Sequence, residues 1–455
     1  MECIVCKFGG TSVATKEKIE HIAGIILGDQ RRRCVVVSAP GKAPGVTIKL
    51  TDLLIRIVKT RLEGKDAAAD VAEVKKRYED IYRPLGLDAG LIADIMSDFD
   101  TRIAADPADP ARYRDAIVGA GEDYNARLFA EYLDRVKKVK ARYISPAMAG
   151  LIVTSEFGNA QPTAEASFNL SALKKEIADH IIVFPGFFGV TADGAVATFS
   201  RGGSDLSGSI LAEALDAMEY ENWTDVDGIF STSPLLVENP EQIPALTYKE
   251  MRELSYIGFN VLHEEAVKPV LAKKIPIRLR NTNNLANTGT LVVAERLPSE
   301  RDVIGIASGG RFCSFTIQKF LMNREKGFGR KLLSIIEDMD LSYEHCPSGV
   351  DNISVILDQT QLKPETVNAI VRAVHEQLRP DEIKSEFGIA LVAVVGEGLL
   401  HKVGILAQAA NALAKAGVNI KMVNQGSSEI SMIFGIDAAD EKKAVNALYN
   451  EFFKS

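Results

Sequence analysis

The stretch IVCKFGGTS, residues 4–12, places a short apolar run before a lysine, two adjacent glycines and two hydroxyl side chains. The apolar run predicts a strand, and Gly9 and Gly10 predict a turn directly after it. This turn has two interpretations. It is a surface turn, or it is a loop whose backbone amides act with Lys7 to bind a phosphate group. The stretch alone does not decide between them.

A strand, a helix and a second strand follow from the residues around this turn. Apolar residues recur at helical spacing from residue 19 to residue 27, and CVVVSAP (34–40) has the β-branched character of a strand buried on both faces. This order predicts a right-handed crossover within a parallel sheet. Residues 48–135 are expected to be mostly helical. Further strands are expected in RYISPAMA (142–149), GLIVTS (150–155), HIIVFPGFFGV (180–190) and AVATFS (195–200).

The last third of the chain carries an internal duplication. SGVDNISVIL (348–357) aligns with QGSSEISMIF (425–434) at an offset of 77 residues, and helix-spaced apolar residues upstream align at the same offset. Each copy fits a β-α-β-β-α-β unit, in which two helices cover a four-stranded antiparallel sheet. Neither copy shows a pattern of catalytic residues.

Composition and charge exclude several classes of protein. The chain has 53 Lys and Arg against 61 Asp and Glu, a net charge of -8, which argues against a nucleic acid as its main partner. The N-terminus does not resemble a signal peptide, and no apolar run reaches the length of about 18 residues that a membrane helix needs. We therefore expect a cytoplasmic protein without a membrane partner. Its scattered histidines and cysteines predict no metal site caged by protein side chains.

A second glycine pair occurs in TFSRGGSDLSGSILAEAL, residues 198–215. Ser204 is a candidate N-cap for the helix that follows, which leaves Arg201, Gly202 and Gly203 at a helix N-terminus. Free amides and the positive end of the helix dipole bind anions at such a position. The alternative is a glycine turn with an exposed arginine.

Two further stretches are less specific. Glu122 in GAGEDY (119–124) is expected to open a helix over 122–134, either as a ligand contact or as a solvated first-turn carboxylate. WTDVDGIFSTSP (223–234) follows a predicted strand, and loops at the carboxyl edge of an α/β sheet commonly bind nucleotides. Neither glycine pair forms a GxxxxGK[ST] phosphate loop, and GAGEDY lacks the third glycine of a dinucleotide fingerprint.

The stretches KFGGTSVA, SRGGSD and WTDVDGI, in this order and before a duplicated tail, resemble the aspartokinase family. The resemblance implies a carbamate-kinase-like amino acid kinase domain at 1–305, a three-layer α/β sandwich with a mostly parallel sheet. It also implies two ferredoxin-like α+β ACT modules, at 311–378 and 383–455, with strands that can be exchanged between them. Members of this family use Mg-ATP to phosphorylate the side-chain carboxylate of L-aspartate, giving 4-phospho-L-aspartate on the route to lysine, threonine and methionine.

The resemblance implies a role for each residue at a matching position. Lys7 matches the lysine that bridges the ATP phosphates, and Arg201 matches the guanidinium that holds the α-carboxylate of aspartate. Glu122 matches the carboxylate that meets the substrate ammonium, and Asp205 matches the acid that orders the site. The other implied ATP contacts are Phe8, Gly9, Gly10, Ser12, Gly202, Gly203, Thr224, Asp225 and Phe230, and the other implied aspartate contacts are Ser38, Thr51 and Ser204.

The duplicated tail is implied to be regulatory. ACT modules pair across subunits and bind a small amino acid, so the resemblance implies feedback by lysine, alone or with threonine, and a homodimer or tetramer. The implied effector contacts are Met322, Gly327, Phe328, Gly329, Ser342, Glu344, Ser348 and Asp351. Solvated loops are the alternative for these positions.

The sequence departs from the family pattern at two places. Leu235 stands where many members have an arginine, and Asn260 stands where many have a lysine, which puts nucleotide contacts from those positions in doubt. Two other hypotheses remain at this point. One is an amino acid kinase acting on glutamate, N-acetylglutamate or a nucleotide, and the other is an amino-acid sensor with an inactive kinase domain.

Overall fold

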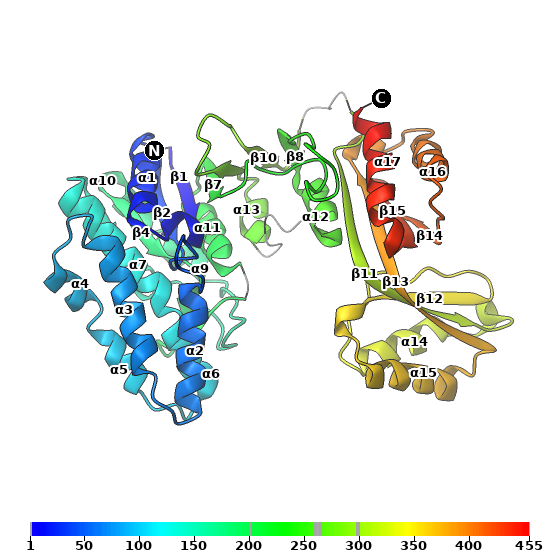
Figure 1. The fold of residues 1–455 in the computed structure, drawn as a ribbon, viewed down its shortest axis with the longest axis horizontal. Helices are drawn as coiled ribbons and strands as arrows, with labels where there is room; N and C mark the ends of the chain where they lie inside the picture. The colour runs from blue at the N-terminus through cyan, green and yellow to red at the C-terminus, as the bar shows by residue number, and fades with distance from the viewer. Residues whose placement is uncertain (1, 201, 259–261, 263–265, 297–300, 455) are drawn as a thin grey trace. The chain divides into compact units, whose positions relative to one another are not determined.

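The computed structural model describes residues 2–200, 202–258, 262, 266–296 and 301–454. These residues form two compact units (Figure 1). The first unit comprises Met1–Ile229, Pro244–Tyr248 and Asn260–Arg296, and the second comprises Phe230–Ile243, Lys249–Phe259 and Leu297–Ser455. This division differs from the range 1–305 predicted for the first domain, because segments 230–243 and 249–259 belong to the second unit.

An eight-stranded sheet forms the centre of the first unit. Its strands are β1 (Ile4–Phe8), β2 (Arg32–Val37), β3 (Ala141–Tyr143), β4 (Ile181–Pro185), β7 (Glu219–Thr224), β8 (Ala245–Thr247), β9 (Ile277–Asn281) and β10 (Thr290–Val293). The strand order is β3-β4-β2-β1-β7-β9-β10-β8, and every neighbouring pair is parallel except β9 with β10. The expected mostly parallel α/β sheet is confirmed.

Helices cover both faces of this sheet. They are α1 (Lys16–Leu27), α2 (Leu50–Leu62), α3 (Ala68–Tyr82), α4 (Ala89–Ile95), α5 (Asp98–Ala104), α6 (Pro110–Val118), α7 (Ala120–Glu131), α8 (Pro146–Ala149), α9 (Ala166–Leu170), α10 (Leu173–Asp179), α11 (Gly203–Ala214) and α13 (Val267–Ala272), with the short helices η1 (Gly10–Val13) and η2 (Tyr132–Val136). One face of β1 packs in a core with α1, α2, α3 and α7, and α11 packs against β1, β2 and β7. Because side chains alternate along a strand, Cys6 enters the first core and Lys7 faces α11.

The helix predicted from residues 19–27 is confirmed as α1. The side chain of Thr15 caps its N-terminus by accepting a hydrogen bond from the Lys18 amide at 3.3 Å. Ile19, Ile22 and Ile26 are buried along its inner face, as the helical spacing requires.

Three of the expected strands were wrong in extent. In RYISPAMA, β3 ends at Tyr143 and residues Pro146–Ala149 form α8, because Ser145 caps a helix with Pro at its start. GLIVTS forms only isolated bridges at Ile152 and Val153. HIIVFPGFFGV breaks at Gly186 into β4 and β5 (Phe188–Val190), and β5 pairs with β6 (Val196–Thr198) in a separate two-stranded sheet.

One antiparallel sheet of five strands runs through the second unit. The strands are β11 (Gly305–Gln318), β12 (Asn352–Asp358), β13 (Glu382–Val395), β14 (Met422–Gln425) and β15 (Ser431–Asp437), in the order β12-β11-β13-β15-β14. Long strands β11 and β13 pair from Gly305 opposite Val395 to Gln318 opposite Glu382, with shifts of register between Gly309 and Cys313. The two modules, each expected to hold a four-stranded sheet with strands that can be exchanged between them, therefore share one sheet, because these two strands continue from one module into the other.

Each end of this sheet has its own helices and its own core. The helices are α12 (Tyr248–Ile257), α14 (Phe328–Glu337), α15 (Pro364–Leu378), α16 (Ile405–Lys415) and α17 (Glu441–Phe453), with the short helices η4 (Met322–Arg324), η5 (Gln359–Gln361), η6 (Glu397–Leu399) and η7 (Ala438–Asp440). Phe315 and Ile317 of β11 pack with α14 and α15, whereas Ile306 of the same strand packs with α16 and α17. Ile383 of β13 packs against the first of these cores and Val392 lies in the second. Each module thus includes half of a strand that begins in the other sequence repeat.

In the part of the chain that the structure describes, no helix combines the length and apolar character needed to cross a bilayer. All five cysteines are free thiols, and four of them are buried.

Candidate active site

A cavity of about 430 Å³ lies in the first unit, where the chain leaves β1, β2 and β7. This is the carboxyl edge of the parallel sheet, where α/β folds bind their ligands. The cavity brings together these predicted site residues: Lys7, Gly10, Ser38, Thr51, Glu122, Gly202, Gly203, Ser204, Asp205 and Asp225.

Lys7 provides a cation in the cavity. It lies near the end of β1, and its Nζ is 2.5 Å from Oδ1 of Asp205 in the first turn of α11. Both side chains are only 12% exposed. A cation held this firmly is already positioned before any ligand binds, which reduces the reorganisation that binding requires.

The loops after β1 and β2 touch through their backbones. The Gly41 amide donates a hydrogen bond to the Gly10 carbonyl at 2.8 Å. A Cβ atom on Gly10 would lie 2.8 Å from the Ala39 carbonyl oxygen, and one on Gly41 would lie 2.7 Å from the Gly10 carbonyl carbon. Only glycine permits this approach, and η1 begins directly at Gly10.

The second glycine pair begins α11, but not with the expected cap. Gly202 occupies the cap position with φ 79°, a left-handed conformation that favours glycine. Ser204 lies inside the helix, so its prediction as the N-cap was wrong. Its side chain packs so closely on Gly186 that a Cβ there would lie 2.6 Å from Ser204 Oγ. The positive end of α11 nevertheless points at the cavity, as its lining residues Gly203 and Asp205 indicate.

Glu122 is a buried carboxylate rather than a solvated one. It lies in the first turn of α7, is 4% exposed, and its Oε1 accepts a hydrogen bond from the Ala39 amide at 3.0 Å. Its Oε2 is buried and has no hydrogen-bond partner within the described residues. Burial raises the pKa of Glu122 to about 8, against the lowering effect of the hydrogen bond from Ala39. An oxygen of this kind is suited to a cationic ligand group.

Some predicted nucleotide contacts do not line the cavity: Phe8, Gly9, Ser12, Thr224 and Phe230. The side chain of Phe8 is fully buried on the opposite face of the sheet, stacked on Trp223 with ring centroids 5.9 Å apart. Ser12 is also buried, with its Oγ 3.3 Å from Oγ1 of Thr282. Phe230 belongs to the second unit, where it forms a bridge with Gln242.

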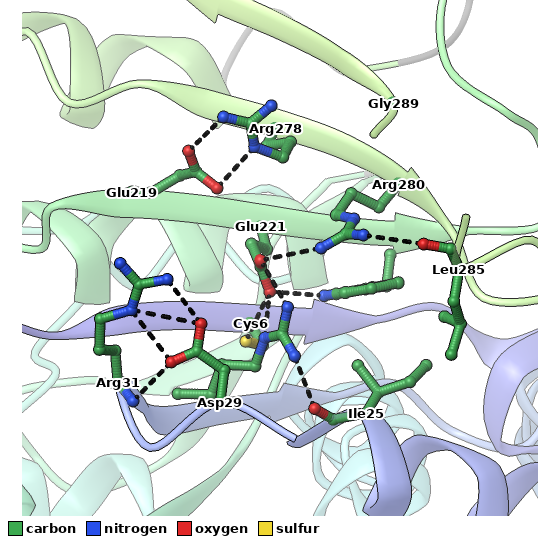
Figure 2. A network of polar contacts seen from close by, with 12 residues as sticks. Cys6, Ile25, Asp29, Arg31, Glu219, Glu221, Arg278, Arg280, Leu285 and Gly289 are labelled. Atoms are coloured by element: carbon green, nitrogen blue, oxygen red, sulfur yellow. Dashed lines mark hydrogen bonds and ion pairs between the residues drawn. The ribbon is translucent and has the colours of Figure 1, made fainter. Parts of the chain in front are cut away.

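Glu221 lies in a buried network of polar contacts on the face of the sheet opposite Lys7 (Figure 2). Arg32 donates to both oxygens of Glu221, at 2.7 and 2.9 Å, and the Trp223 indole donates to the same carboxylate at 2.9 Å. The guanidinium of Arg280 lies 4.6 Å from the Trp223 ring centroid. Burial acts to raise the pKa of Glu221, but the hydrogen bonds and charge of Arg32 outweigh it and lower that pKa. The Trp223 carbonyl, in turn, accepts the Gly9 amide at 3.3 Å.

Other residues that line the cavity were not identified from the sequence: Thr11, Ala39, Pro40, Gly41, Lys49 and Phe187. Lys49 is an exposed cation directly before α2, two residues ahead of Thr51, and it forms no ion pair with the described residues. The sequence indicates Lys49 only through its place in KLTDLL (49–54), which contains the predicted aspartate contact Thr51. Gly41 follows the strand CVVVSAP, but nothing in its sequence context indicates the contact with Gly10.

The predicted aspartate contact Arg201 and the two positions that depart from the family pattern are not among the described residues that line the cavity. Arg201 and Asn260 lie outside the described residues. Leu235 lies in the second unit with 90% of its surface exposed.

The predicted effector contacts lie in the first of the two modules. Gly327 caps the N-terminus of α14 with φ 78°, and Phe328 and Gly329 begin that helix. Met322 and Asp351 border the loop after β11, where Asp351 accepts the Leu321 amide at 2.9 Å.

The remaining three positions lie on the chain between α14 and β12. Ser342 donates to Gln361 at 3.1 Å, and Glu344 donates its amide to Ile356 at 2.8 Å. Ser348 lines a groove of about 410 Å³ formed by residues of all five strands of the sheet or of their flanking segments. None of the other predicted effector contacts lines that groove.

Residues 2–281 match the model of the Amino acid kinase family, and residues 392–452 match that of an ACT domain. Aspartokinase 3 of Bacillus subtilis is 48% identical over 449 residues, which cover 99% of this chain and 98% of that protein. The crystal structure of Clostridium acetobutylicum aspartate kinase has a TM-score of 0.87 and 36% identity, covering 99% of this chain and 100% of that one.

Escherichia coli aspartokinase III resembles the chain in two ligand complexes. Its complex with aspartate and ADP (R-state) has a TM-score of 0.77 at 25% identity, covering 99% of this chain and 100% of that one. Its complex with lysine and aspartate (T-state) has a TM-score of 0.79 at 25% identity, covering 100% of both chains.

Proposed function

The chain belongs to the aspartokinases of the amino acid kinase family, and from this we infer that it transfers the terminal phosphoryl group of ATP to the side-chain carboxylate of L-aspartate. The product is 4-phospho-L-aspartate, the first intermediate on the route to lysine, threonine and methionine. The enzyme is an allosteric phosphotransferase whose regulation resides in its ACT modules.

One observation carries this inference: a single cavity holds both a firmly placed cation and a buried glutamate with one oxygen that has no hydrogen-bond partner among the described residues. Lys7, with the N-terminus of α11, is suited to the phosphate groups of ATP. Glu122, whose Oε2 lacks a partner, is suited to the ammonium group of an amino acid. The phosphates of ATP complement Lys7, and the ammonium of aspartate favours the ionised form of Glu122, whose pKa burial otherwise raises.

The reaction needs no general base. The β-carboxylate of aspartate has a pKa of about 3.9 and is already an ionised nucleophile at neutral pH. The difficulty is to bring this anion in line with a polyanionic nucleotide and to stabilise the charge that develops on the transferring phosphoryl group. Lys7 and the backbone amides of the loops at Gly10 and Gly203 supply that stabilisation.

The two substrates are held by different parts of the cavity. Ser38, Thr51 and Ser204 lie on its lining and offer hydroxyl groups to aspartate, with Glu122 on its ammonium. Arg201 is assigned to the α-carboxylate of aspartate by the family resemblance alone. Asp225 and the glycines on the lining belong to the nucleotide side, where Thr224 adjoins them at the end of β7.

Magnesium would be held by the nucleotide more than by protein side chains. Among the described residues no group of three or more His, Cys, Asp or Glu side chains is placed to hold a metal ion. Asp205 already pairs with Lys7, and Asp225 is exposed at the cavity. This set suits Mg²⁺ held mainly by ATP phosphates and water, which is how the ion usually reaches phosphoryl-transfer sites. Bound there, it neutralises phosphate charge.

The second unit binds the effector. Lysine, alone or with threonine, binds at the positions from Met322 to Asp351 named above, and the chain forms a homodimer or tetramer through its ACT modules. The complex of Escherichia coli aspartokinase III with lysine and aspartate supports this choice of effector. The protein acts in the cytoplasm.

Trapping the acyl phosphate with hydroxylamine tests this function. The full chain is incubated with Mg-ATP and either L-aspartate or L-glutamate, with lysine and threonine titrated separately and together. Hydroxamate that depends on ATP and on aspartate, and that lysine suppresses, is the expected result. Equal or greater product from glutamate would instead indicate another amino acid kinase, and no product from either would indicate an inactive sensor.

A further inference from the structure

Asn222 lies beside the Lys7–Asp205 ion pair, on the face of the sheet that α11 covers. It stands opposite Lys7 in the parallel pairing of β1 with β7, so both side chains emerge on the face covered by α11. Asn222 is 3% exposed, and its side-chain amide donates to Oδ1 of Asp205 at 2.9 Å. That oxygen is the one that accepts the Lys7 ammonium at 2.5 Å. One oxygen of Asp205, Oδ1, therefore contacts side chains from both β1 and β7.

A second residue of β7 holds the same turn of α11 without touching the carboxylate. The Tyr220 hydroxyl donates to the backbone carbonyl of Asp205 at 3.1 Å. Gly208 makes room for this ring, since a Cβ there would lie 2.6 Å from it. Tyr220 thus fixes the helix backbone, whereas Asn222 fixes the side chain that Lys7 contacts.

We propose that Asn222 is a positioning residue for phosphoryl transfer, which orients Asp205 so that the Lys7 ammonium is presented to the nucleotide phosphates. The proposal rests on the function proposed above. Lys7 has to interact with phosphate oxygens while it is also held by Asp205. A neutral amide on Oδ1 shares the charge of that oxygen and so moderates its hold on Lys7, without adding a charge of its own.

The residue type matters because the site is nearly closed to water. An alanine at 222 would leave Oδ1 with Lys7 as its only side-chain partner among the residues that the structure describes, and would remove one of the two contacts that orient the carboxylate. An ionised aspartate at 222 would place a second negative charge beside Lys7 and draw it away from phosphate. The titratable groups that face this position are Lys7 on β1, Asp205 on α11 and Tyr220 on β7, and Leu279, its partner on β9, is apolar.

Two substitutions test the proposal in the full chain. Asn222→Ala should lower kcat roughly 10- to 100-fold, the effect of losing one hydrogen bond to a charged group. Asn222→Asp should lose more activity at about pH 8 than at about pH 6, because a protonated carboxyl group donates to Asp205 as the amide does. The ratio of wild-type to Asn222→Asp activity should therefore fall as the pH falls.

Tyr220→Phe is the matched control. It removes a buried hydrogen bond from the same turn of α11 but leaves the Asp205 carboxylate and all charges in place. It should lower Tm while keeping the wild-type kcat and pH profile. Circular dichroism verifies that each variant is folded under the assay conditions. If Asn222→Ala does not fold, the pH dependence of Asn222→Asp decides.

Parallel pH profiles for the wild type and Asn222→Asp would overturn the proposal, as would a folded Asn222→Ala with kcat within about twofold of wild type. A failure of the proposed function is distinguishable, because the wild type itself would then form no aspartyl hydroxamate. Calorimetric titration with Mg-ADP adds a readout independent of turnover. Weaker binding is expected for Asn222→Asp than for Tyr220→Phe, and equal binding by these two variants would contradict the proposal.

Discussion

The backbones of Gly10 and Gly41 are in direct contact, with the Gly41 amide donating to the Gly10 carbonyl at 2.8 Å. This contact joins the loops that follow the neighbouring parallel strands β1 and β2. One loop leads from Lys7 into η1, and the other carries the Ala39 amide that binds Glu122. The contact therefore links the loop that follows Lys7 to the loop that binds Glu122.

Gly41→Ala should impair both folding and activity. Its Cβ would lie 2.7 to 2.9 Å from the Gly10 carbonyl group and the Thr11 amide, so one loop has to move. We expect a loss of about 1–3 kcal/mol in the free energy of unfolding, from urea titration, and a lower kcat/KM for ATP. Gly45→Ala is the control for a nearby loop glycine: it has open space around its Cβ but a φ of 79°, so it should cost stability through backbone strain while leaving kcat/KM nearly unchanged. Equal losses of kcat/KM in both variants would contradict a specific role of the Gly10–Gly41 contact in activity.

Lys7→Ala should lower kcat far more than it weakens substrate binding. The side chain stabilises charge that develops during transfer, and the loss of such a group typically costs roughly 10²- to 10³-fold. Initial rates of hydroxamate formation over a range of ATP concentrations separate kcat from KM. Lys42→Ala, which removes an exposed lysine that does not line the cavity, should behave as wild type. Near-normal kcat in Lys7→Ala would refute its role.

Glu122→Gln should raise the KM for aspartate with little change in the KM for ATP. The amide is similar in size but cannot form an ion pair with the substrate ammonium. Because steric fit is retained, the loss should be in binding rather than in folding. An unchanged KM for aspartate would show that the ammonium binds elsewhere.

The raised pKa of Glu122 also predicts in which direction the stability of the protein changes with pH. This pKa is raised from 4.5 to about 8 in the folded protein, so between these values the folded state binds more protons than the unfolded state. Stability from this group is therefore present below pH 4.5 and is lost as the pH rises through about 8. Relative to wild type, Glu122→Gln should gain stability as the pH rises over this window, measured as Tm without substrate. A constant difference in Tm would contradict the buried, unpaired state of Glu122.

Glu221→Gln should be strongly destabilising, since it leaves Arg32 buried without its counter-charge. Breaking a buried pair by removing one partner costs about 3–5 kcal/mol. Asp70→Asn removes the partner of Arg56 in an exposed pair and should cost at most about 1 kcal/mol. Chemical denaturation of both variants gives the comparison, and similar losses would show that the Glu221 network adds no special stability.

Most elements of the first unit could be predicted because their patterns are local. The apolar run before Lys7, the helical spacing of α1 and the β-branched run in β2 each contain the information for one element. The prediction of Ser204 as a cap was wrong for a non-local reason. Its side chain packs against Gly186, and the left-handed Gly202 begins the helix instead.

The alternation of strands and helices around the first glycine pair, the duplication of the tail and the two glycine loops follow from the sequence alone, because periodicity and turn chemistry act between neighbouring residues. Which side chains meet follows from the three-dimensional packing. Strand register brings Asn222 beside Lys7 and turns Phe8 away from the cavity, and pairing along β11 and β13 merges the two modules into one sheet. Most of these relationships join residues far apart in the chain, so they depend on which strands pair and on how the helices pack, and the spacing of neighbouring residues specifies neither.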